Sequence, residues 1–196
     1  MLLRRRNYLV RQRVAVLALA DTYDILDPES GQTIGLAREE LGEGARLGRL
    51  FLKKAYLPST VRVHESETAP PVLTLRSRPG LLGHAVVVTD ATGREIGRFQ
   101  RKAFSLGVSF LVLGRSGERI AEVKGDWKGW NFRFLGAGGG ELGRVTKKWA
   151  GIGREILASA GTYVVSLTEQ GTGNPDHAPL LLAAALAIDL VFRERQ

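Results

Sequence analysis

Basic side chains stand next to one another at several points of the chain, and paired cations are suited to binding phosphate groups. Lys and Arg hold phosphates through charge-assisted hydrogen bonds, and anionic lipid surfaces attract them by charge. We therefore expect a lipid- or phosphate-binding site at six residues: Lys53, Lys54, Arg101, Lys102, Lys147 and Lys148. The competing interpretation is that such residues protect exposed strand edges from aggregation.

The residue types that most often carry catalysis or metal binding are few and scattered. His64, His84 and His177 lie too far apart in sequence for a local metal-binding pair. The chain has no cysteine and no Gly-x-Ser-x-Gly motif, which excludes thiol catalysis and argues against hydrolase chemistry. The glycine clusters at 136–140 and 171–173 lack the Lys-Ser/Thr of a phosphate loop. We expect no catalytic residue, no metal site and no cofactor.

Positive charge is in excess, with 28 Lys and Arg against 20 Asp and Glu. A net charge of +8 attracts anionic lipid headgroups, nucleic acid and acidic proteins alike. Nucleic acid is the less favoured partner, because no aromatic RNA-binding motif is recognisable. The apolar run Val14 to Ala20 is short for a signal peptide and has Arg13 beside it, which favours a first strand.

A repeated hairpin pattern indicates which elements position the basic residues. In each of its four copies, a β-rich run is followed by a turn with Asp or Gly and then by a second apolar run. The hairpins join Tyr23–Leu26 to Ile34–Leu36, Val86–Thr89 to Ile96–Phe99, Phe110–Leu113 to Ile120–Val123, and Phe132–Leu135 to Leu142–Val145. The small residue that follows each Ile or Leu permits close approach or bending, as in barrels. Further strands are expected at Tyr8–Arg13, Val61–His64, Val72–Ser77 and Thr162–Leu167, which brings the total to about twelve.

The stretch from Leu180 to Phe192 is apolar nearly all round and rich in Leu and Ala, which predicts a helix after Pro175 and Pro179. Such a helix must be buried in protein or lipid, and it is too short to span a membrane. We predict a mainly β fold: one domain over residues 1–196, a closed barrel of about twelve strands around this helix. A short basic helix is also expected at Ala45–Ala55.

Several segments of the chain resemble sequences of the superfamily that groups phospholipid scramblases, LURP-one-related proteins and the Tubby C-terminal domain. Tyr8 to Gln12, Tyr23 to Asp27 and Gly31 are similar to the opening of LURP-one-related proteins. Leu142 to Val145, Lys147-Lys148-Trp149, Gly151 and Arg154-Glu155 precede the apolar helix in the scramblase order. The resemblance implies a twelve-stranded barrel around the C-terminal helix. From Tubby domains it also implies phosphoinositide binding by basic residues on adjacent strands.

One departure concerns calcium: scramblases carry an acidic segment before the terminal helix, whereas residues 159–176 contain only Glu169 and Asp176. The resemblance therefore does not extend to calcium dependence. We expect a non-catalytic, scramblase-like domain that binds anionic phospholipid or phosphoinositide headgroups. It would be cytoplasmic or peripheral at the inner face of a membrane. The alternative is a cytoplasmic protein- or nucleic-acid-binding or structural module without lipid activity.

Overall fold

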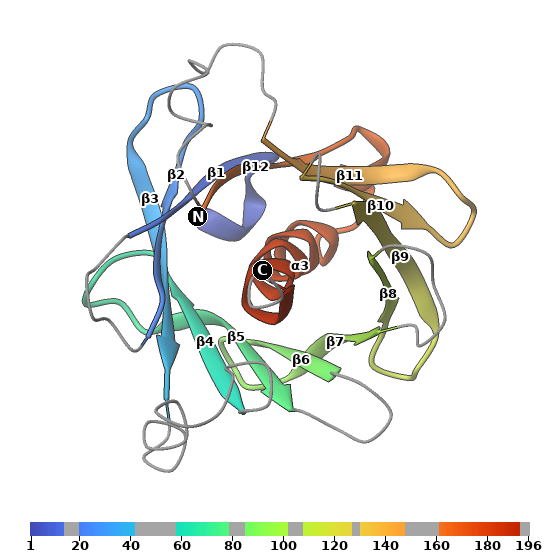
Figure 1. Cartoon of the computed structure of the whole chain (residues 1–196), viewed down its shortest axis with the longest axis horizontal. Helices are drawn as coiled ribbons and strands as arrows, with labels where there is room; N and C mark the ends of the chain where they lie inside the picture. The colour runs from blue at the N-terminus through green and yellow to red at the C-terminus, as the bar shows by residue number, and fades with distance from the viewer. Residues whose placement is uncertain are drawn as a thin grey trace.

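The fold is that of a computed structural model, which describes residues 1–13, 20–41, 58–78, 85–101, 108–126, 130–147 and 161–192. Within these ranges the chain forms twelve strands and one α-helix (Figure 1). The strands are β1 (Asn7–Gln12), β2 (Thr22–Leu26), β3 (Thr33–Glu40), β4 (Ser59–His64), β5 (Pro71–Arg78), β6 (Ala85–Asp90), β7 (Glu95–Arg101), β8 (Val108–Leu113), β9 (Arg119–Asp126), β10 (Asn131–Gly136), β11 (Glu141–Thr146) and β12 (Thr162–Leu167). The helices are α3 (His177–Phe192) and the short 3-10 helices η1 (Leu2–Arg4) and η3 (Gln170–Gly173).

The strands close into a barrel in which each pairs antiparallel with the next and β1 pairs with β12. Leu9 of β1 lies opposite Val164 of β12 at this closure. Figure 1 shows the ring of strands around α3. The predicted barrel is confirmed. The described strands therefore leave no open lateral edge.

All four predicted hairpins are present, as β2–β3, β6–β7, β8–β9 and β10–β11. The β6–β7 turn shows why Asp and Gly are needed. The Asp90 carboxylate accepts hydrogen bonds from the backbone N–H groups of Thr92 (2.9 Å) and Arg94 (3.1 Å). Gly93 between them has φ +81°, a conformation that favours glycine.

Two wall glycines let the helix approach closely. A Cβ at Gly97 of β7 would lie 2.9 Å from Cδ2 of Leu180, and one at Gly143 of β11 would lie 2.5 Å from Cδ2 of Leu181. Both distances are too short for a side chain, so glycine makes room for the leucines of α3. The expectation that small residues after Ile or Leu allow close approach is confirmed at these two positions.

The helix α3 fills the interior of the barrel and packs against strands on several sides. It begins at His177, three residues before the predicted start, with the Leu180 N–H donating to the Asp176 carbonyl at 3.1 Å. Pro179 falls in the first turn, where a backbone N–H is not required. Leu180 and Leu182 are fully buried, which confirms burial in protein. Among the described helices, none has both the length and the apolar character needed to cross a membrane.

One charged residue lies inside this apolar core. Asp189 of α3 is 2% exposed and accepts a hydrogen bond of 2.6 Å from the hydroxyl of Tyr23 on β2. Burial, followed by the neighbouring Asp189, raises the pKa of Tyr23 well above its ordinary value, so the hydroxyl keeps its proton and donates. This bond joins the C-terminal part of the helix to one wall of the barrel.

The two ends of the barrel differ in their connections. Tight turns join β2 to β3, β6 to β7, β8 to β9 and β10 to β11 at the end where α3 begins, here called the turn end. At the opposite end β1, β3, β5, β7, β9 and β11 finish, and residues that follow them lie outside the described ranges. Outside these ranges also lie the predicted helix at Ala45–Ala55 and the run Val14 to Ala20 except its last residue.

Candidate anion-binding face

Of the six predicted binding residues, the structure describes Arg101 and Lys147; Lys53, Lys54, Lys102 and Lys148 lie outside the described residues. Arg101 is the last residue of β7, opposite Phe110 of β8. Lys147 directly follows β11. Three strands lie between β7 and β11 in the barrel, so these two cations share one end of the molecule without being neighbours.

Lys147 lies over an aromatic cluster at that end. Its Nζ is 5.3 Å from the centroid of the Trp130 ring, a cation–π contact of about 0.5–1 kcal/mol at a surface. The Trp130 ring stacks on Tyr163 at 5.1 Å and meets Phe132 edge-on at 5.7 Å. The Trp130 ring is therefore partly buried against the apolar core.

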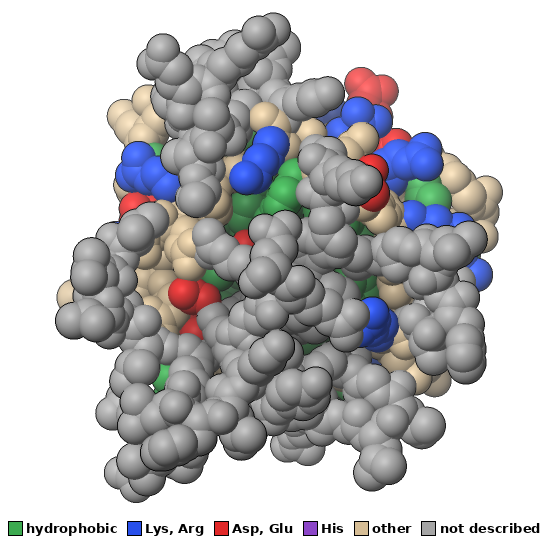
Figure 2. All heavy atoms as spheres, in the orientation of Figure 1, with side chains coloured by type: hydrophobic (Ala, Val, Ile, Leu, Met, Phe, Trp, Pro, Cys, Tyr) green, Lys and Arg blue, Asp and Glu red, His purple; other side chains and the backbone are tan. Residues whose placement is uncertain are grey.

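A more concentrated cationic site lies on the outer wall. Lys124 of β9, Arg133 of β10 and Arg144 of β11 are directly opposite one another in register and all are exposed. We call these three residues the cation row. Adjacent strands lie about 4.8 Å apart, so the three charges start from neighbouring backbone positions. In Figure 2, in the orientation of Figure 1, Lys and Arg side chains gather at the upper right, over β9 to β11.

Carboxylates neutralise the outer members of the cation row but not its centre. Arg144 bonds to Glu141 at 2.8 Å, and this hydrogen bond raises the pKa of the guanidinium. Nζ of Lys124 is 3.6 Å from Glu122. Arg133 forms neither a hydrogen bond nor an ion pair within the described part of the chain. Like charges placed directly opposite are destabilising, and here they are unrelieved at Arg133.

Glu122 organises one side of the row. Its carboxylate is 3% exposed although it lies on the outer wall. It accepts hydrogen bonds from Oγ of Ser109 and Nη2 of Arg119, both at 2.7 Å. One buried carboxylate thus holds two cations, Arg119 and Lys124, against the wall.

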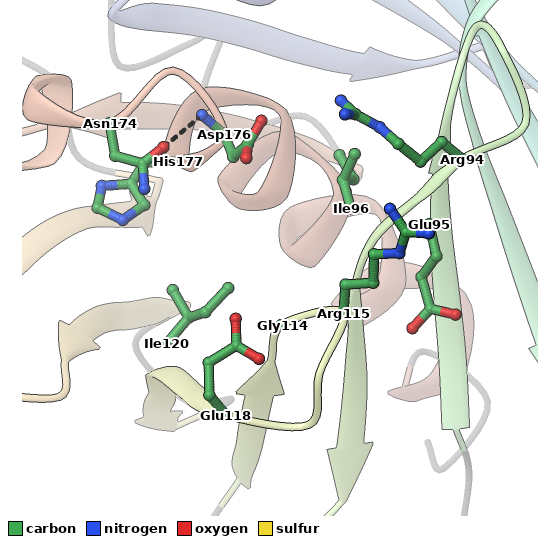
Figure 3. A pocket seen from close by; sticks show the side chains of 10 residues that line it. All are labelled: Arg94, Glu95, Ile96, Gly114, Arg115, Glu118, Ile120, Asn174, Asp176 and His177. Atoms are coloured by element: carbon green, nitrogen blue, oxygen red, sulfur yellow. Dashed lines mark hydrogen bonds between the residues drawn. The ribbon is translucent and has the colours of Figure 1, made fainter.

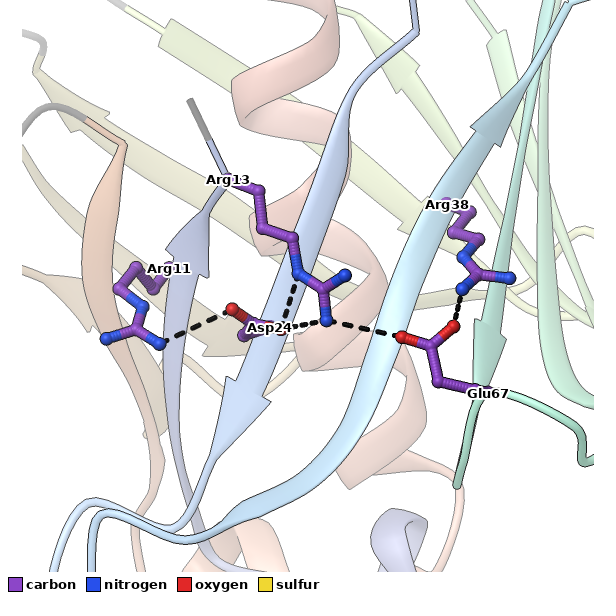
Figure 4. Close-up of polar contacts among 5 residues, drawn as sticks. All are labelled: Arg11, Arg13, Asp24, Arg38 and Glu67. Carbon is purple, nitrogen blue, oxygen red and sulfur yellow. Dashed lines mark hydrogen bonds and ion pairs between the residues drawn. The ribbon is translucent and has the colours of Figure 1, made fainter. Parts of the chain in front are cut away.

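The wall formed by β1 to β4 shows the opposite arrangement (Figure 4). Asp24 bridges Arg13 (2.6 Å) and Arg11 (3.4 Å). Glu67 pairs with Arg13 at 3.3 Å and also with Arg38. Burial opposes ionisation of Asp24, but the hydrogen bonds and charges of the two arginines outweigh it and lower its pKa.

The same wall also contains arginines in direct opposition. Arg38 of β3 lies opposite Arg62 of β4, yet Arg38 has Glu67 and Arg62 has Glu40 at 2.7 Å. Opposed arginines are therefore matched with carboxylates here, whereas Arg133 is not.

Sequence reasoning missed the cation row because it looked for adjacent basic pairs. Consecutive residues of a strand point to opposite faces, so a pair cannot put both charges on one face. Single cations alternating with apolar residues do so, as in Phe132-Arg133-Phe134, and that alternation is visible in the sequence. The register that aligns three such strands is not visible in the sequence.

In the described ranges, no group of three or more His, Asp or Glu side chains is placed to hold a metal ion. His64 and His177 each bond a backbone carbonyl through Nδ1, of Ala69 (2.8 Å) and Gly171 (3.0 Å) respectively. Both are half-buried and serve the loops around them.

A family model described as Scramblase matches residues 78–195, more than half of the chain, from the last residue of β5 to beyond α3. The match includes the whole cation row; it leaves out residues 8–31, where the LURP-one resemblance stays a prediction. Neither the curated proteins nor the solved structures gave a significant match. On the family model, the chain belongs to the Scramblase family.

Proposed function

We propose that this protein is a non-catalytic binding domain that docks on anionic phospholipid headgroups through the cation row on β9 to β11. The observation that carries the proposal is Arg133, which has a cation opposite it on both sides and no carboxylate among the described residues. Phosphate is a ligand that relieves such repulsion, because it brings negative charge and several hydrogen-bond acceptors. Membership of the Scramblase family adds weight to a lipid ligand.

The expected strength of membrane binding follows from the charge of the cation row. A Lys or Arg near an anionic membrane surface contributes about 1 kcal/mol at low salt. Because Glu141 and Glu122 neutralise Arg144 and Lys124, the uncompensated charge of the row is that of Arg133, which contributes about 1 kcal/mol, or about fivefold in affinity. Salt screens such surface attraction strongly. Binding should therefore be reversible and sensitive to ionic strength. We further propose a peripheral position at the inner face of a membrane, where the anionic lipids are concentrated.

Vesicle co-sedimentation tests this function. Vesicles of phosphatidylcholine alone are compared with vesicles that also contain phosphatidylserine or a phosphoinositide, at low and at physiological salt. We expect retention only on the anionic vesicles, weakening as salt rises. If anionic vesicles fail to retain the protein at low salt, the lipid function is overturned. Binding of an RNA or DNA probe in the same buffer would then favour the alternative of a nucleic-acid-binding module.

A further inference from the structure

A pocket at the turn end of the barrel carries charged groups that neither the cation row nor the core uses. It has a volume of about 240 Å³ and lies between the β6–β7 turn, the β8–β9 turn and the start of α3 (Figure 3). About 30 Å³ per water-sized group gives room for on the order of eight non-hydrogen atoms. The space therefore suits a small metabolite or a lipid headgroup.

Most charged side chains that line the pocket already have partners. Arg94 bonds to Asp90 at 3.0 Å and Glu95 to Arg98 at 2.8 Å. The Glu118 carboxylate accepts hydrogen bonds from the hydroxyl and backbone N–H of Ser116, which lower its pKa. These three residues shape the pocket, and their charges are largely satisfied within the protein.

Two exposed charges in the lining remain without such partners. The Arg115 guanidinium and the Asp176 carboxylate form no ion pair or side-chain hydrogen bond with any residue in the described ranges. Both line the pocket, and no ion pair joins them. In Figure 3, Arg115 lies across the pocket from Asp176, which comes from the chain just before α3.

His177 adds a polar atom on the Asp176 side. Its Nδ1 is 3.0 Å from the Gly171 carbonyl, which only accepts hydrogen bonds, so Nδ1 carries a proton. In the neutral ring Nε2 is then the acceptor. One side of the pocket thus offers a carboxylate and a ring nitrogen lone pair, and the other side offers a guanidinium.

We infer that this pocket binds a small zwitterion, with its anionic group at Arg115 and its ammonium group at Asp176 and His177. Each end of the ligand meets the charge and hydrogen-bonding groups that it needs. Phosphoethanolamine has this chemistry and about the right size. The same chemistry is available from a free metabolite or from the headgroup of phosphatidylethanolamine. The inference does not depend on the proposed function, since the cation row lies elsewhere on the barrel.

Isothermal titration calorimetry with phosphoethanolamine is the test, with inorganic phosphate and ethylamine as single-charge probes. We expect phosphoethanolamine to bind at least tenfold more tightly than either probe. R115Q should weaken phosphoethanolamine and phosphate at least tenfold. D176N should weaken phosphoethanolamine by a similar factor while phosphate binding stays the same or improves. Both residues are exposed, so neither variant should disturb folding.

The matched control is R94Q, which removes an arginine of the same pocket that Asp90 already holds; it should change phosphoethanolamine affinity less than threefold. Phosphatidylethanolamine vesicles distinguish the two sources of the ligand. If the vesicles compete with phosphoethanolamine for the protein, the ligand is a lipid headgroup. If they do not compete, the ligand is a free metabolite. The inference is overturned if phosphoethanolamine binds no better than phosphate, or if R115Q and D176N bind like the unmodified protein. R133E should leave this binding intact, which separates it from the proposed function.

Discussion

The β1–β4 wall and the β9–β11 wall of one barrel both carry opposed cations, yet they resolve the repulsion differently. On β1 to β4, each of four arginines is paired with a carboxylate, and Asp24, Glu40 and Glu67 are the partners. On β9 to β11, Arg133 has a cation on each side and no acidic partner in the described ranges. Each of the four arginines on β1 to β4 thus has an acidic partner within the protein. The β9–β11 wall is satisfied best by an external anion, and this difference is the basis of the functional proposal.

Removing the Asp24 carboxylate, which two arginines of the β1–β4 wall share, should have the largest effect on stability. Asp24 is 8% exposed and bonds two arginines, so D24N should lower the free energy of unfolding by about 2 kcal/mol at neutral pH. It should also increase retention on anionic vesicles, because Arg11 loses its carboxylate partner and Arg13 keeps only Glu67. Urea unfolding and co-sedimentation measure the two effects. Glu29→Gln, an exposed carboxylate, is the control and should change neither; unchanged stability of D24N would mean that the two walls do not differ in this way.

Acid should erase that stability difference. The pKa of Asp24 is lowered in the folded protein, so its charge stabilises the fold above the unfolded-state pKa of about 3.9. The contribution is lost as the pH falls through the folded-state pKa. The gap in unfolding free energy between the unmodified protein and D24N should hold from neutral pH to about pH 5 and then shrink. A gap that stays constant to pH 2 would show that charge is not its cause.

The buried carboxylate of the cationic wall gives the next largest effect. E122Q keeps the shape but removes the charge that holds Arg119 and Lys124, so unfolding free energy should fall by about 1–2 kcal/mol. The face gains one net positive charge, and retention on anionic vesicles should rise about fivefold. E40Q is matched to it in chemistry but lies in an exposed pair with Arg62. It should cost less than about 0.5 kcal/mol. Equal effects of the two variants would contradict the role given to Glu122.

The smallest expected changes in stability have opposite signs on the two walls. R133A removes the unrelieved central cation, so stability should rise slightly, by up to about 0.5 kcal/mol. R13A removes an arginine that joins Asp24 to Glu67, and stability should fall by about 1 kcal/mol. Paired thermal unfolding of the two variants measures the difference. A loss of stability in R133A would indicate that Arg133 already has a stabilising partner.

The strands, the hairpins and the buried helix were predictable because their signals are local. Alternating apolar residues and Asp-Gly turns define the strands, and the unbroken Leu and Ala stretch defines α3. The binding face depends on register, which no local pattern supplies: Lys124, Arg133 and Arg144 are nine and eleven residues apart in sequence but directly opposite in the barrel. Glu67 was equally hidden, since it reaches Arg13 and Arg38 from the β4–β5 connection.

The most direct test compares two charge reversals of equal size. Arg133 and Arg76 are both exposed arginines without a described partner, but Arg76 lies opposite Thr60 and Val87, five strands away from Arg133. On phosphatidylserine vesicles at low salt, R133E should lose affinity roughly thirtyfold, corresponding to about 2 kcal/mol for two charge units. R76E should lose less than about threefold, because it is remote from the face. Equal losses would show that net charge alone governs binding, and would contradict a binding face on β9 to β11.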